Sequence, residues 1–197
     1  SFTSVDVSVI SSSVYYLVQT TESQFYVISF GSLADFKTFQ LKSIVSVELS
    51  TELQHFRLFV PLGGNLTITA CNKAGTQGNF IVLKASDNDI ARTNYAFNFH
   101  SASQDCHCAM GKDQGFMFVV DNNLYTFSAT DLSTVKSVAI VFSKIDCKLR
   151  LVDGGYNDDF VLAGDCRTEV IHNQNPALFL KVTSTGGMNA EDRSGLV

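Results

Sequence analysis

The most reactive side chains of this sequence stand together in the run Asp105-Cys106-His107-Cys108. A cysteine beside a histidine can form a nucleophile and its base, and both residue types are common ligands of zinc. A zinc site would need two further ligands, and its usual spacing is C-x-x-C, whereas a single residue separates these two cysteines. We therefore predict a polar loop in which Cys106 or Cys108 forms a disulfide with Cys71, which leaves one odd cysteine.

The other candidates for acid–base chemistry are scattered along the chain. No G-x-S-x-G, H-E-x-x-H or phosphate-binding glycine motif accompanies any histidine. The histidines are His55, His100, His107 and His172. A fold can still gather two carboxylates from separate segments for glycoside hydrolysis. The acidic candidates for that role are Asp87, Asp89, Asp158, Asp159 and Glu169. None has a companion motif, so we predict no catalytic residue and no bound cofactor.

An acidic hairpin at 151–164, LVDGGYNDDFVLAG, offers oxygen ligands for calcium. The candidate ligands are Asp153, Asn157, Asp158 and Asp159. The segment resembles the integrin-type FG-GAP blades, in which an acidic loop before an apolar strand holds calcium. Its loop is about two residues shorter than in that family. The alternative interpretation is an exposed turn built from Gly, Asn and Asp.

Cys147 and Cys166 lie at nearly equal distances from the centre of the same turn, near Tyr156. In an antiparallel hairpin this spacing places the two residues opposite or nearly opposite each other. Opposite Cα atoms lie within disulfide reach. We therefore predict a Cys147–Cys166 disulfide.

Composition favours a secreted or cell-surface protein. The cysteine pairs, the low charged content of 17% and the sequon Asn65-Leu66-Thr67, with a possible glycan on Asn65, all point in this direction. The net charge is −5 without any basic run, which argues against nucleic-acid binding. No apolar run approaches the roughly 18 residues of a membrane-spanning helix, so we predict no membrane insertion.

Short runs rich in β-branched and aromatic residues alternate with polar turns along the whole chain, which predicts an all-β fold with little helix. We expect strands at Val14–Val18, Phe25–Phe30 and Phe36–Leu41, and similar sets recur at about 40–50 residues. This period predicts four meander blades of a β-propeller, at about 1–42, 43–86, 94–142 and 143–185, with 186–197 a tail or the start of a further blade. The alternative is two tandem β-sandwiches of about 100 residues each.

The clearest copy of the repeat lies within Gly115–Val141. Its run CAMGKDQGFMFVVDNNLYTFSATDLSTVKSVAI resembles the blades of WD-repeat-like and surface-layer-type propellers, although it lacks their Trp-Asp pair. The segment 25–41 aligns with 124–140, so a doubled unit of about 100 residues is also present. Recognition is then expected in the irregular loops 86–94 and 101–114.

These patterns predict a non-catalytic module that binds a protein partner or identical subunits. An unfinished propeller leaves two blade faces uncovered, and both ends of the chain suggest that more chain flanks it, so further blades or other copies are expected to cover the faces. The strong form of this hypothesis is a structural subunit of a polymer. The alternative is a fragment of a propeller hydrolase or carbohydrate-binding enzyme whose site is completed by absent chain.

Overall fold

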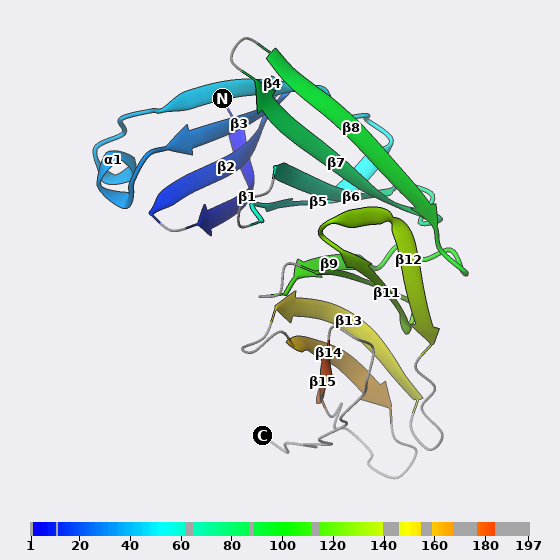
Figure 1. Cartoon of the computed structure of the whole chain (residues 1–197). Coiled ribbons are helices and arrows are strands. Elements are labelled where there is room, and N and C mark those ends of the chain that lie inside the picture. The colour runs from blue at the N-terminus through cyan, green and yellow to red at the C-terminus, as the bar shows by residue number, and fades with distance from the viewer. Residues whose placement is uncertain are drawn as a thin grey trace. The chain divides into compact units, whose positions relative to one another are not determined.

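The computed structural model describes residues 2–10, 12–61, 65–86, 89–111, 115–139, 146–154, 159–167 and 177–183 (Figure 1). The strands are β1 (Phe2–Ile10), β2 (Ser13–Thr20), β3 (Phe25–Phe30), β4 (Ser43–Val47), β5 (Leu53–Phe59), β6 (Leu66–Asn72), β7 (Gln77–Ser86), β8 (Asp89–Asn98), β9 (Cys106–Met110), β10 (Phe116–Val120), β11 (Asn123–Ser128), β12 (Asp131–Ala139), β13 (Asp146–Gly154), β14 (Asp159–Arg167) and β15 (Ala177–Thr183). A five-residue helix, α1 (Leu33–Lys37), follows β3. The predicted all-β class is confirmed.

The strands form four antiparallel sheets in which chain neighbours pair. The first sheet has the order β1-β2-β3-β4, the second β5-β6-β7-β8, the third β12-β11-β10-β9 and the fourth β13-β14-β15. This sequential order is the meander that the turn pattern predicts. The sequence pattern also predicts a strand at 168–172, which lies outside the described residues.

The predicted strand Phe36–Leu41 is wrong, because the chain forms α1 here instead. Ser32 is the N-cap: its Oγ accepts a hydrogen bond from the Asp35 N–H at 3.1 Å and donates to Asp35 Oδ2 at 2.8 Å. The first of these bonds satisfies the Asp35 N–H, one of the backbone donors that the first helical turn leaves without a partner, and the second orients the two side chains. A local cap therefore overrides the β-propensity of the Phe and Thr residues that follow.

The first two predicted blade limits fall one strand too early, whereas the limit at 142–143 falls between the third and fourth sheets. β4 pairs with β3 and closes the first sheet, while β8 closes the second, so the chain at 43–47 and 89–98 belongs with the preceding strands. The presumed loops 86–94 and 101–114 contain β8 residues and β9. Hydrogen-bond pairing decides to which sheet an outer strand belongs. Each outer strand pairs with the strand before it, and the connections between the two differ in length from sheet to sheet.

The chain divides into two compact units, each with its own core: Ser1–Lys73 with Asn79–Tyr95, and Ala74–Gly78 with Ala96–Val197. In the first unit the core is Leu17, Phe25, Val27, Val47, Leu58, Ile68, Ala70, Ile81 and Leu83, from the first and second sheets. In the second unit it is Ala109, Met117, Val119, Leu124, Leu149, Val152, Phe160 and Leu162, from the third and fourth sheets. Each unit thus buries one face of two meander sheets.

No helix in the part of the chain that the structure describes has the length and hydropathy to span a membrane.

Candidate functional site

The first sheet carries an apolar face that its own core does not use. Side chains alternate along its strands, so odd-numbered residues such as Leu17 and Val27 enter the core, and even-numbered residues point to the other face. Tyr16 lies opposite Ile28, and Ile28 lies opposite Ile44, which brings three strands together on that face. The result is a groove of about 600 Å³.

We call this surface the aromatic groove. Its lining consists of Tyr16, Val18, Thr20, Tyr26, Ile28, Phe30, Phe36, Phe39, Leu41 and Ile44. Its volume lies within the range of roughly 300–1,000 Å³ that is usual for binding sites. Four of the eight large apolar side chains that are exposed in the described part of the chain lie at positions 33–44: Leu33, Phe39, Leu41 and Ile44. Such a concentration marks an interaction surface.

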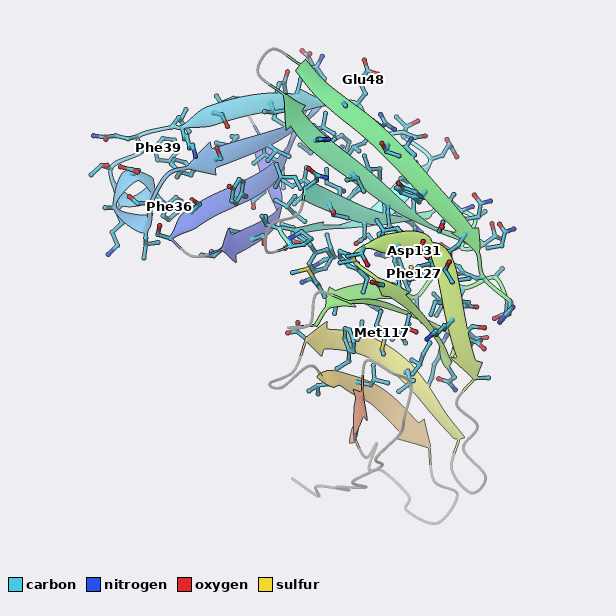
Figure 2. All side chains as sticks on the ribbon, in the orientation of Figure 1. Phe36, Phe39, Glu48, Met117, Phe127 and Asp131 are labelled. Atoms are coloured by element: carbon cyan, nitrogen blue, oxygen red, sulfur yellow. The ribbon has the colours of Figure 1, made fainter. Side chains whose placement is uncertain are left out.

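Helix α1 and the turn after it supply one wall of the groove, beside the end of the first sheet (Figure 2). The Phe36 ring stacks on Tyr16 at 5.5 Å between centroids, and it meets Phe30 edge-on at 5.3 Å. Phe39 meets Phe30 edge-on at 5.9 Å while 73% of Phe39 is exposed. The stacked rings hold the wall in place, and Phe39 presents most of its surface to solvent.

Phe39 occupies a backbone conformation that an aromatic residue rarely adopts. Its φ is +59°, and its N–H donates to the Phe36 carbonyl while the Gln40 N–H donates to the Asp35 carbonyl at 2.7 Å. This pair of bonds is a Schellman motif, in which glycine usually takes the left-handed position. A bulky side chain there costs about 1–2 kcal/mol relative to the right-handed region. Strain at an exposed aromatic residue is typical of a position kept for recognition.

The chemistry of the groove is that of a binding surface. The described residues that line it include no charged one, and those with polar side chains are Tyr16, Thr20 and Tyr26. The Tyr26 hydroxyl donates to Gln24 Oε1 at 3.0 Å, and Thr20 Oγ1 accepts from the Gln24 N–H at 3.2 Å. An apolar surface with a few hydroxyls at its margin can bury an apolar partner.

The predicted reactive run forms a structural element. Cys71 and Cys106 are joined in a disulfide, which confirms one of the two predicted pairings. The Cys108 thiol is buried and donates to the Ala109 carbonyl at 3.8 Å. His107 lies in β9, so the predicted loop is a strand. The described residues contain no group of three or more potential metal ligands.

Cys147 and Cys166 lie directly opposite each other in the pairing of β13 with β14. The predicted antiparallel placement is therefore confirmed at the level of the backbone. The side chains of both residues lie outside the described part of the structure, so the bond itself stays a prediction.

Among the calcium and carboxylate candidates, Asp153 has a described side chain. Asp153 is exposed, and its Oδ1 accepts a hydrogen bond from the Gly154 N–H at 2.8 Å. The remaining candidates, of which nothing or only the backbone is described, are Asp87, Asp89, Asn157, Asp158, Asp159 and Glu169.

The described histidines and the sequon have local roles. The His100 N–H donates to the Tyr125 hydroxyl at 2.7 Å, and burial raises the pKa of Tyr125. His55 has a positive φ of 56° at the irregular part of β5, and His172 lies outside the described residues. Asn65 is exposed, and Thr67 Oγ1 donates to its carbonyl at 3.1 Å.

Sequence reasoning missed the aromatic groove, although a signal for it was present. The runs Val14–Val18 and Phe25–Phe30 are apolar at both odd and even positions, whereas a strand with one solvated face alternates. Such runs predict that both faces of the strand are covered by other parts of the protein. In the structure, the core of the first unit covers one face, and the aromatic groove lies on the other. No protein-family model and no curated protein matches this chain.

Proposed function

We propose that this chain is a non-catalytic β-repeat module that acts by protein–protein contact and self-assembly, with the aromatic groove as its contact surface. The observation that carries the proposal is a groove of about 600 Å³ without a charged residue, walled by a strained and exposed Phe39. Burying such a surface against a partner contributes about 25 cal/mol for each Å² removed from water. Its aromatic side chains are of the kind that dominates the energy of interfaces.

The sheets are, in this proposal, blades of a propeller-like assembly. The sequential strand order in each described sheet supports it, as does the face-to-face packing of two sheets within each unit. The aromatic groove then lies on a blade face that awaits its neighbour, which is supplied by another copy of the chain. A propeller blade normally packs on both faces, and this requirement explains why both faces of β2 and β3 are apolar.

An extracellular or cell-surface location belongs to the same proposal. The Cys71–Cys106 disulfide is compatible with an oxidising compartment. The exposed position of Asn65 is compatible with glycosylation at the sequon.

Replacement of Phe39 by glycine tests the proposal. Phe39→Gly removes the exposed ring and also relieves the left-handed strain, so the variant should be at least as stable as the wild type to heat. Sedimentation velocity across a wide range of protein concentration should show smaller species for Phe39→Gly than for the wild type. Leu33→Ala is the matched control, because Leu33 is 53% exposed on α1, the helix just before Phe39, and does not line the groove. Identical size distributions for the wild type and Phe39→Gly would overturn the proposal.

A further inference from the structure

Strand β4 is an edge of the first sheet and has none of the usual protection of an edge. Exposed edge strands ordinarily carry charges, prolines or bulges that prevent pairing with another chain. The β4 sequence Ser43–Val47, SIVSV, has no charge and no proline, and its pairing with β3 is regular. By contrast, β1 has a register shift next to Asp6, and β12 has a register shift together with Asp131 and Lys136.

Two opposite charges flank this unprotected strand at equal distances from its centre. Lys42 precedes β4 and Glu48 follows it, three residues to either side of Val45. Both side chains are exposed, and neither takes part in an ion pair among the described residues. The Glu48 backbone is held in place, because its carbonyl accepts a hydrogen bond from the Arg92 guanidinium. Figure 2 labels Glu48 beside the end of β4.

We propose that β4 pairs with β4 of a second copy of this chain, antiparallel and with Val45 opposite Val45. The two-fold axis then passes through the sheet between the two Val45 residues, as in an isologous dimer. Lys42 of each copy lies opposite Glu48 of the other, so the register forms two ion pairs with no like charges facing each other. Edge pairing of this kind takes most of its affinity from backbone hydrogen bonds.

The register also suits the apolar positions. Ile44 lies opposite Ser46 of the second copy and diagonal to the other Ile44, at a separation that side chains bridge across paired strands. Ile44 is 56% exposed and lines the aromatic groove, so pairing covers it from the open side and places the two grooves on one continuous face. A shift of two residues in either direction removes both ion pairs, which makes this register the favoured symmetrical one.

This contact goes beyond the proposed function, since it uses the edge of the sheet and leaves the groove open. Phe39→Gly therefore provides the background for its test, because the most exposed side chain of the groove is removed there and the groove contact is weakened. In that background we expect a dimer by sedimentation equilibrium. Lys42→Glu and Glu48→Lys should each weaken the dimer about tenfold, since two attractive pairs become repulsive, and the double exchange should restore it. Lys136→Glu, at an exposed residue of β12 in the third sheet, should have no such effect.

A cross-linking experiment checks the register itself. Val45→Cys places the two new thiols directly opposite each other, within disulfide reach, whereas Ser46→Cys places them two residues apart diagonally. Oxidation should give a covalent dimer with Val45→Cys and not with Ser46→Cys. A monomeric Phe39→Gly variant, or charge reversals that leave the dimer unchanged, would overturn β4 pairing while the groove proposal stands. If Phe39→Gly forms a dimer and its size distribution is the same as that of the wild type, β4 pairing is supported and the groove proposal is overturned.

Discussion

Asp6 connects the two sheets of the first unit, and its replacement gives a quantitative test of this packing. Asp6 Oδ2 accepts a hydrogen bond from the Leu58 N–H at 2.7 Å and another from Arg57 Nε at 3.0 Å. The side chain enters where the register of β1 shifts next to Asp6, and it meets β5 just after the shift between Gln54 and Arg57. Asp6→Ala would leave the Leu58 N–H without its acceptor.

The two bonds differ in their expected contributions to the free energy of unfolding. Leu58 is 2% exposed, and a hydrogen bond from a buried donor to a charged acceptor contributes about 1.5–3 kcal/mol. The Arg57 side chain is 43% exposed, so its ion pair with Asp6 contributes roughly 0–1 kcal/mol. Asp6→Ala should therefore lower the free energy of unfolding by about 2–3 kcal/mol. Asp6→Asn, which keeps an acceptor for Leu58 and loses the charge, should lower it by about 1 kcal/mol.

Urea unfolding followed by far-UV circular dichroism is the suitable assay, because the chain has no tryptophan. Asp6→Ala should also lower the melting temperature by roughly 5–10 °C, at about 2–4 °C for each kcal/mol in a chain of this length. Arg57→Ala is the matched control and should cost about 1 kcal/mol, from the ion pair and the contact of its guanidinium with the Phe59 ring at 5.5 Å. An Asp6→Ala variant within about 0.5 kcal/mol of the wild type would refute this account, since that is the usual effect of a surface substitution.

Three further predictions concern the second unit. A Cβ on Gly154 would lie 2.3 Å from the Met110 carbonyl oxygen, so Gly154→Ala should lower the free energy of unfolding by about 1–3 kcal/mol, measured by urea unfolding. The Ser133 hydroxyl donates to Asp131 Oδ1 at 2.6 Å, and this bond leads the interactions that lower the pKa of Asp131 to about 2. The pKa of Asp131 lies below its ordinary value of 3.8, so the charged carboxylate stabilises the turn fully above pH 3.8. The turn should loosen as the pH falls towards 2, as followed by NMR titration of its amides. Peptide mapping without reduction should recover Cys147 linked to Cys166, and free thiols at both after denaturation would contradict that bond.

Local patterns predicted most of the strands and several turns correctly. The turn Asp121-Asn122 has positive φ at both residues, 47° and 62°, as the hairpin between β10 and β11 requires. The opposition of Cys147 and Cys166 followed from counting outwards from one turn. Such features depend on residues close in sequence, so alternation and turn chemistry suffice to predict them.

The aromatic groove and the limits of the sheets could not be obtained in this way. The segments 25–41 and 124–140 align in sequence, yet the first contains β3 and α1 and the second most of β11 and all of β12. The cap at Ser32 is what makes the first segment helical after β3. The helix in turn places Phe36 on Tyr16, a contact between residues twenty positions apart in the sequence. A helix of this length depends on tertiary contacts for its stability.

The sequence by itself determined that this chain is a series of antiparallel meanders, because period-two alternation and Asn, Asp and Gly turns are local properties. Only the tertiary structure decided which apolar face of the first sheet enters a core and which one stays open as the aromatic groove. Both faces of β2 and β3 are apolar, so their own residues do not distinguish them. The choice depends on where the second sheet packs, and that is settled by contacts such as Asp6 with Leu58, between residues far apart in the chain.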